Sequence, residues 1–319
     1  MPDNRYEKTP RPGQGHFVAP PEEVRVGVVD AVDTSEAPSS LWGDAWRDMR
    51  HRALFWVSAA LIVFVILMAT VPALFTSADP RACFLEDSLG APAAGHIFGF
   101  DRQGCDIYAR AIYGARASVI VGLLSTVFVV VVGTLVGSIA GYFGGWLDSL
   151  LSRFTDIFFA VPFVLAAIVI MSLLEDRNEV VVAVVLAAFG WTSIARITRG
   201  AVLGVKNNEF VTAAKALGMG RLAILGKHIL PNAAAPIIVY ATVALGTFIV
   251  AEATLSFLGI GLPTSTVSWG GDLAKAQASI RVAPEIMAYP ATALALTVLS
   301  FIMMGDVVRD ALDPKARKR

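Results

Sequence analysis

Six apolar segments, each close to the length that crosses a membrane, dominate this sequence. They cover residues 53–75, 117–142, 154–174, 180–197, 234–258 and 287–307. The hydrocarbon core of a bilayer is crossed by about 20 apolar residues in a helix. The chain is 55% hydrophobic and 16% charged, which is too apolar for a water-soluble domain. We therefore expect an all-α membrane protein with six transmembrane helices.

The distribution of basic residues predicts how these helices are oriented. Most Lys and Arg residues lie before the first segment, between the fourth and fifth, and after the sixth. Cytoplasmic loops of membrane proteins carry such an excess, so both termini are expected in the cytoplasm. The formal net charge is zero, so no basic excess indicates nucleic acid as a partner. Membrane lipid is an expected partner because of the apolar segments.

The chain divides into a short polar part and a long apolar part. Residues 1–46 are rich in Pro, Gly, Asp, Glu and Ser, a composition that predicts a disordered cytoplasmic tail, with a regulatory arm as the alternative. Residues 47–319 form the predicted transmembrane domain. Its two long connections are an external loop, 76–116, and a cytoplasmic loop, 199–233.

The cytoplasmic loop has the pattern of two short helices. Asn208 is a candidate N-cap, and Gly218 supplies a left-handed end to the first helix. Apolar residues repeat at helical spacing from 222 to 229, and Pro231 is expected to stop the second helix. The resulting elbow is interpreted as a docking surface, and the alternative is a connector lying on lipid headgroups.

One face of the first elbow helix carries small and apolar residues, and its sequence resembles a family motif. Thr212, Ala213 and Ala214, followed by Gly218 and then by His228, Leu230 and Pro231, resemble the EAA loop of binding-protein-dependent ABC importer permeases. The resemblance implies the type I ABC importer permease fold, with this loop as the cytoplasmic coupling helix between helices 4 and 5. The residues implied in ATPase coupling are Glu209, Phe210, Thr212, Ala213, Ala214, Leu217, Gly218, His228 and Pro231.

Two other regions resemble the dipeptide, oligopeptide and nickel permeases. Residues 96–116 look like the region before the second span of that family, although Phe100 stands where Thr is usual and Cys105 where Arg is usual. Residues 255–270 and 305–314 resemble its external motif and its terminal signature. Together the resemblances imply a C-type permease domain over most of residues 50–316.

The resemblance also implies partners. They are a second, B-type permease, one or two ABC ATPase subunits that hold ATP and Mg, and an extracellular or periplasmic substrate-binding protein. The implied substrate is a peptide, with nickel or its chelates as the alternative. The chain itself is expected to hold no cofactor.

The two cysteines of the chain, Cys83 and Cys105, both fall in the predicted external loop. An even pair facing an oxidising compartment predicts one disulfide, which would hold the loop in shape. The alternative is a metal site in which His96 and Asp101 join the two thiols.

Glycine recurs every four residues at the end of the second segment. Gly133, Gly137, Gly141 and Gly145 would stack along one helical face, where another helix can approach closely. The pattern predicts tight helix packing.

Few polar residues lie inside the apolar segments. Glu252 is expected either to line a pathway or to form a buried hydrogen bond between helices. Trp191 and Ser193 are polar enough to line a cavity. All three are therefore candidates for the translocation pathway.

No catalytic pattern is found in the sequence. Gly220, Gly226 and Lys227 lack the spacing of a phosphate-binding loop, and the histidines are scattered. A non-catalytic subunit is therefore expected. The alternative from another class is an ion-gradient transporter with Glu252 as its ion site, but no internal repeat supports it.

Overall fold

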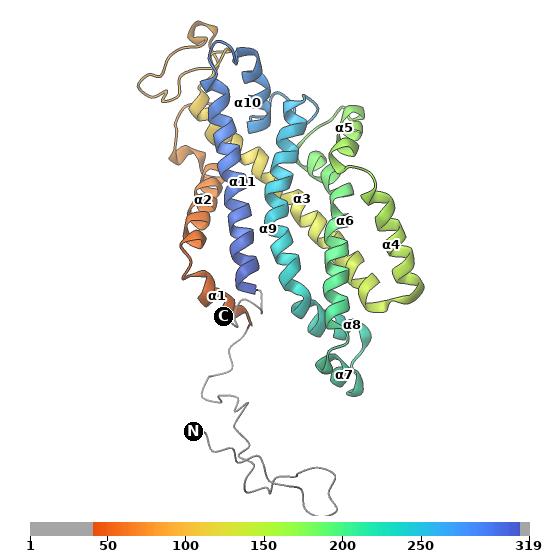
Figure 1. The fold of residues 1–319 in the computed structure, drawn as a ribbon. Coiled ribbons are helices and arrows are strands. Elements are labelled where there is room, and N and C mark those ends of the chain that lie inside the picture. Colours follow the sequence, from red (N-terminus) through yellow and green to blue (C-terminus); the bar gives the residue numbers. More distant parts are fainter. Residues whose placement is uncertain (1–40, 313–319) are drawn as a thin grey trace, which may run out of the picture. The chain divides into compact units, whose positions relative to one another are not determined.

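The computed structural model describes residues 41–312, and the regular secondary structure of this part of the chain is helical apart from isolated β-bridges. Figure 1 labels its α-helices. They are α1 (Leu41–Met49), α2 (Ala53–Thr70), α3 (Ile107–Phe143), α4 (Gly145–Phe159), α5 (Phe163–Leu173), α6 (Glu179–Val205), α7 (Glu209–Ala216), α8 (Arg221–Ile224), α9 (Leu230–Phe257), α10 (Trp269–Ala276) and α11 (Glu285–Leu312).

Among the described residues, five helical stretches are long and apolar enough to cross a membrane. They are α2, α3, α6, the continuous stretch Arg221–Phe257 and α11. The pair α4 and α5 makes a sixth span if the two helices are counted together, but they meet at 71°. The segment predicted over 154–174 therefore falls on a bent pair of helices and not on one continuous helix. Pro162 disfavours the helical conformation at the preceding residue and cannot donate a backbone hydrogen bond.

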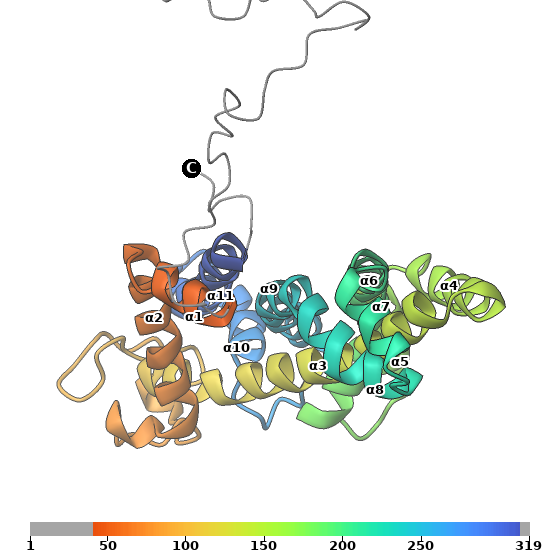
Figure 2. The ribbon, with the colours of Figure 1, turned by 90° about the horizontal axis from the view of Figure 1, so that it is seen from below.

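The long helix α3 organises the bundle. It runs obliquely across α11, α9 and α6, as Figures 1 and 2 both show, and it contacts α2, α4, α6, α9, α10 and α11. It begins ten residues earlier than the segment predicted at 117, because Asp106 caps it by accepting a hydrogen bond from the Ala109 N–H at 2.9 Å.

The glycine ridge lies where α3 crosses α6. A Cβ on Gly133 would lie 2.8 Å from the Trp191 carbonyl oxygen, and one on Gly141 would lie 2.9 Å from the Arg199 carbonyl oxygen. Gly137 is equally crowded. Gly145 differs: it opens α4 with φ +61°, and a Cβ on it would meet no atom within 4 Å. The ridge therefore ends at Gly141, because α3 itself ends at Phe143.

The first described helix changes the predicted N-terminal boundary. α1 begins at Leu41, so residues 41–46 are helical and do not belong to a disordered tail. Ala45 is 1% exposed and packs with Ala311 and Leu312 of α11. The burial of Ala45 against α11 stabilises α1 at this position. The rest of the predicted tail, 1–40, and the C-terminal residues 313–319 lie outside the described part of the chain.

Candidate functional site

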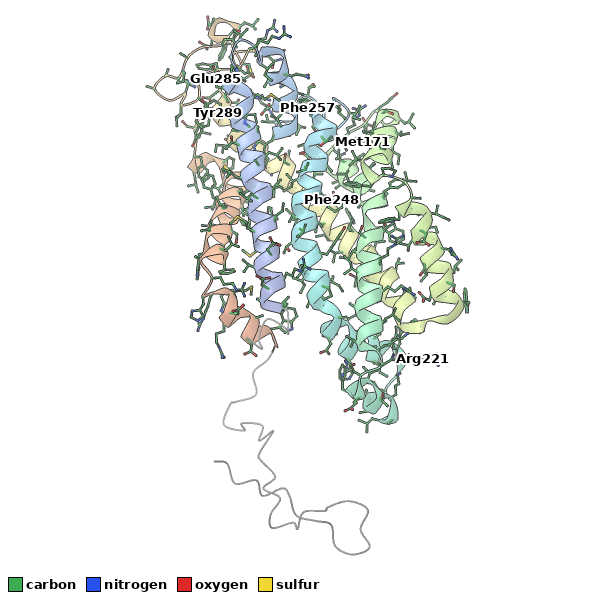
Figure 3. The ribbon with its side chains drawn as sticks, in the orientation of Figure 1. Met171, Arg221, Phe248, Phe257, Glu285 and Tyr289 are labelled. Carbon is green, nitrogen blue, oxygen red and sulfur yellow. A yellow bond between two sulfur atoms is a disulfide. The ribbon has the colours of Figure 1, made fainter. Side chains whose placement is uncertain are left out.

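The polar elbow between α6 and α9 folds as two short helices around a small apolar core. Helix α7 begins after Asn208, whose side chain makes no capping hydrogen bond. The helix ends at Ala216, and Gly218, with φ +77°, turns the chain back. Arg221, at the start of α8, lies at the end of the bundle opposite to Glu285 and Tyr289 (Figure 3).

The inner face of α7 is formed by Val211 and Ala214. These side chains are 0% and 6% exposed, and they pack in one cluster with Ile224, Leu225 and Ile229. Ala214 was predicted to lie on the docking face, and the structure contradicts this. The spacing of Val211 and Ala214, three residues apart, was the missed signal for the buried face.

The outer face of the elbow is apolar and exposed. Leu217 is 86% exposed, Leu222 is 74% exposed and Phe210 is 40% exposed. Glu209, Thr212 and Ala213 are also exposed. An exposed apolar group of this kind on a polar loop is typical of a protein interface. We call Phe210, Thr212, Ala213, Leu217 and Leu222 the elbow surface.

Pro231 does not end the second elbow helix. The stretch Arg221–Phe257 is continuous, because residues Leu225–Ile229 form a π-helical turn before α9. The wider turn accommodates the proline ring, which has no N–H to donate and would clash with the carbonyl one turn before it. The Asn232 side chain donates to the His228 carbonyl oxygen at 2.6 Å. The second elbow helix is thus continuous with the fifth span.

Two further contacts join the elbow region to neighbouring helices. The Arg199 guanidinium, near the end of α6, donates to both carboxylate oxygens of Asp148 in α4 at 2.6 and 2.7 Å. The Lys206 ammonium donates to the Gly141 carbonyl oxygen at the end of α3, at 2.8 Å. These contacts connect the end of α6 and the start of the elbow to α4 and α3.

A cavity of about 200 Å³ lies at the break between α4 and α5, against α6 and α9. Ser193 and Tyr240 line it from α6 and α9. Thr247 and Phe248 of α9 also line it. Trp191 does not line this cavity: it is 6% exposed and donates to the Ala188 carbonyl oxygen. Tyr240 was missed, although it is a polar aromatic residue within an apolar span.

Glu252 lies inside the helix packing. It is 0% exposed, and it accepts a hydrogen bond from the Ser256 hydroxyl at 2.7 Å. The same Ser256 oxygen accepts from the Leu262 N–H at 3.1 Å. Glu252 does not line the cavity beside Ser193, and its contacts fit the interpretation as a buried hydrogen bonder that holds the end of α9.

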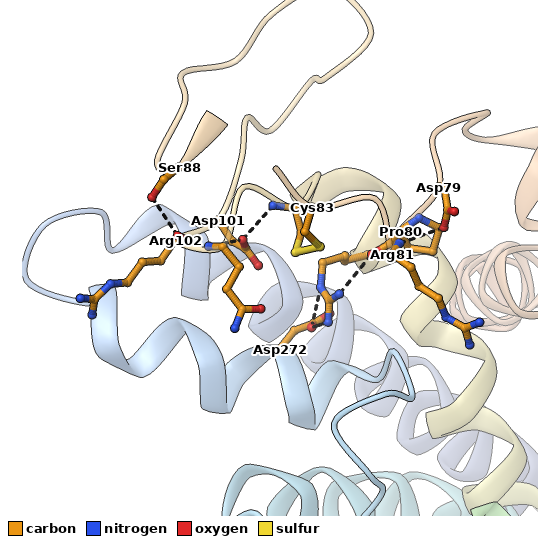
Figure 4. The surroundings of a disulfide bond; sticks show 11 residues. Asp79, Pro80, Arg81, Cys83, Ser88, Asp101, Arg102 and Asp272 are labelled. Atoms are coloured by element: carbon orange, nitrogen blue, oxygen red, sulfur yellow. Dashed lines mark hydrogen bonds and ion pairs between the residues drawn. A yellow bond between two sulfur atoms is a disulfide. The ribbon is translucent and has the colours of Figure 1, made fainter. Parts of the chain in front are cut away.

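The external side of the bundle is held together by a disulfide and a buried ion pair (Figure 4). Cys83 and Cys105 are joined, so neither thiol is available to a metal, and His96 pairs with Asp106. Asp101 accepts hydrogen bonds from the Gln103 and Cys105 N–H groups at 2.7 and 2.9 Å. These contacts shape the loop after the first span.

The ion pair joins this loop to α10. Arg110 contacts Asp272 and also donates to the Pro80 carbonyl oxygen at 3.1 Å. Burial raises the pKa of Asp272, and the Arg110 charge opposes that rise. Burial also lowers the pKa of Lys275, one turn further along α10.

The motif Ser268, Trp269, Gly270 has a structural explanation. The Ser268 side chain caps α10 by accepting from the Gly271 N–H at 3.1 Å. The fully buried Trp269 donates to the Ala111 carbonyl oxygen at 2.8 Å. A Cβ on Gly270 would lie 2.6 Å from the backbone of Ala253. The motif therefore seats α10 on α3 and α9.

Comparison with known sequences identifies similar proteins over most of the described range. Residues 133–318 match the profile of the binding-protein-dependent transport system inner membrane component. Residues 40–92 match the N-terminal transmembrane domain of oligopeptide transport permease C. The first match contains the elbow, and the second contains the first span and the start of the external loop.

Individual relatives show the same similarity. The chain is 37% identical to the oligopeptide transport system permease protein OppC of Bacillus subtilis, over 91% of this chain and 94% of that protein. It is 38% identical to the dipeptide permease DppC of Alkalihalophilus pseudofirmus, over 87% and 91%. It is 36% identical to the glutathione permease GsiD of Escherichia coli O157:H7, over 86% and 91%.

A solved structure has a similar fold. An inward-facing form of the MetNI methionine ABC transporter contains a chain that superposes with a TM-score of 0.54 at 20% identity. The match covers 64% of this chain and 96% of that one. It supports the fold predicted from the sequence.

Proposed function

This chain belongs to the family of binding-protein-dependent transport system inner membrane components, and we propose that it is the C-type permease of a peptide importer. It is a multi-pass protein of the cell membrane. A peptide is proposed as the substrate because the chain is 36–38% identical to permeases named for oligopeptide, dipeptide and glutathione transport.

The proposed assembly has four kinds of component. A second, B-type permease would complete the translocation pathway, and one or two separate ATPase subunits would bind ATP and Mg and hydrolyse ATP. A substrate-binding protein outside the membrane would deliver the peptide. Both termini and the elbow would face the cytoplasm, where the ATPases are.

In this proposal the elbow surface is where an ATPase docks. The exposed side chains of Phe210, Leu217 and Leu222 would enter a groove on that partner, and desolvation of these three groups would supply the affinity. Val211 and Ala214 would keep α7 in place on the bundle. The exposed residues Glu209 and Thr212 would form the polar rim of the contact.

Continuity of the helix from Arg221 to Phe257 suggests how movement reaches the pathway. When the ATPases close on ATP, a displacement of the elbow would tilt this helix as a rigid body. Tyr240, which faces the cavity beside Ser193, would move with it. The external end of α9, which is held by Glu252, Ser256 and Leu262, would move together with the rest of the helix. The two ends of the pathway would therefore open in turn.

Uptake measurements test the substrate. Cells that lack this chain should lose import of labelled di- and oligopeptides, and the full-length gene should restore it. Loss of nickel uptake with unchanged peptide uptake would instead support the nickel or chelate alternative. Peptide uptake that survives ATP depletion but collapses with an ionophore would support an ion-gradient transporter.

A further inference from the structure

Tryptophan and arginine side chains gather on the outside of the corner between α1 and α2. Trp42, Trp46 and Trp56 are 47%, 53% and 58% exposed. Arg47 and Arg50 are exposed as well. We call these five residues the α1 corner. Because α2 begins at Ala53 and is a candidate membrane span, the corner lies where the chain enters the bilayer.

The corner is held in a fixed shape. The Trp56 indole N–H donates to the Arg50 carbonyl oxygen at 3.0 Å across the turn. Phe55 packs edge-to-face against Trp46 and Trp56, with ring centroids 5.6 and 5.3 Å apart. The opposite face of α1 is anchored by Ala45, which packs with the end of α11. The exposed side chains therefore project from a rigid base.

Two arginines of the corner lie outside the ion pairs of the neighbouring residues. Arg52 bridges Asp48 and Asp310 at 2.9 and 2.8 Å, so it occupies both carboxylates. Arg47 and Arg50 form no ion pair with another described residue. Two guanidinium groups are thus free to bind an anion at the membrane surface.

We propose that the α1 corner binds the headgroups of anionic phospholipids. Tryptophan side chains favour the interface between hydrocarbon and water, and guanidinium groups bind phosphate oxygens through several parallel hydrogen bonds. A basic residue at an anionic membrane surface gains roughly fivefold in affinity. Arg47 and Arg50 together therefore predict at least a roughly tenfold preference for anionic over zwitterionic lipid. This preference does not depend on which substrate is transported.

Tryptophan fluorescence with brominated lipids tests the proposal directly. The purified full-length chain is placed in two sets of vesicles with the same mixture of phosphatidylcholine and phosphatidylglycerol. The phosphatidylcholine is brominated in one set and the phosphatidylglycerol in the other. The variant with Trp42, Trp46 and Trp56 replaced by Phe gives the background signal from the other tryptophans. We expect brominated phosphatidylglycerol to quench the corner tryptophans far beyond its share of the mixture.

A pair of charge variants gives the control. The double variant R47Q/R50Q should abolish the preference for phosphatidylglycerol. The control R81Q/R102Q removes the same charge from two exposed arginines of the external loop, and it should leave that preference unchanged. Equal quenching by the two lipids in the wild type would overturn the proposal. An unchanged preference in R47Q/R50Q would also overturn it. If neither lipid quenched the corner tryptophans, protein would cover the corner, and the proposal would again be wrong.

Discussion

Arg110 and Asp272 lie 162 residues apart in the sequence, and the Arg110 Nε donates to the Asp272 carboxylate at 2.9 Å. The pair joins the first turn of α3 to α10. Their side chains are 8% and 10% exposed. Because Arg110 also donates to the Pro80 carbonyl oxygen, one side chain connects the loop before α3 to the helix before the last span.

Removal of one member of this pair should be costly. Arg110→Met leaves the Asp272 carboxylate buried without its partner, and we expect a loss of about 3–5 kcal/mol in stability. The double variant with Asp272→Leu should recover much of that loss. Thermal unfolding in detergent, followed by circular dichroism, measures both. Equal melting temperatures for Arg110→Met and for the control Arg102→Met, at an exposed site, would contradict this account.

The crossing of α3 and α6 should be sensitive to a single methyl group. Gly137→Ala would place a Cβ 2.8 Å from the Thr198 Cβ, and we expect destabilisation of about 1–3 kcal/mol from overpacking. Gly200→Ala is the matched control, because its Cβ would meet no atom within 4 Å. The melting temperature of each purified variant gives the comparison, and an unchanged value for Gly137→Ala would show that the ridge is not tightly packed.

The disulfide should stabilise the external loop. Cys83 and Cys105 are 22 residues apart, and closure of such a loop contributes roughly 3 kcal/mol in the chain-entropy model. Replacement of both by Ala should make residues 84–104 more susceptible to proteolysis. A reducing agent should have the same effect on the wild type and none on the double variant. Identical cleavage of the wild type, the reduced wild type and the double variant would argue against this stabilising role.

The two faces of α7 should respond differently to substitution. Ala214→Trp forces a large side chain into the core of the elbow, so we expect loss of transport together with local unfolding. Leu217→Glu adds a charge to a side chain that is 86% exposed, so the fold should remain and only coupling should fail. Limited proteolysis and peptide uptake separate the two effects. The same proteolysis pattern in both variants would contradict the assignment of the faces.

Most of the helical framework could be predicted from the sequence, because long apolar segments leave few alternatives in a membrane. Two of the differences from the prediction lie at prolines. Pro162 breaks the third span, whereas Pro231 lies within a continuous helix because a π-helical turn accommodates its ring. Whether a neighbouring turn widens depends on tertiary contacts, and the local sequence does not reveal it.

The two-helix elbow was predicted from its sequence pattern, but the buried and exposed faces of α7 were not. Phe210, Ala213, Ala214 and Leu217 share one helical face by spacing, yet burial divides that face. Ala214 and Val211 turn inward because Ile224, Leu225 and Ile229 fold back beneath them. A helix of eight residues has too few positions for its buried face to be predicted from spacing alone. The prediction also needs the position of the residues that pack beneath the helix.

The measurement that tests the central claim most directly compares two tagged chains purified from native membranes. Mass spectrometry should find a second permease, an ABC ATPase and a substrate-binding protein with the wild type. Leu217→Glu should retain the second permease and lose the ATPase. The account is contradicted if the wild type is recovered alone or as a homo-oligomer, or if Leu217→Glu keeps a full complement of ATPase.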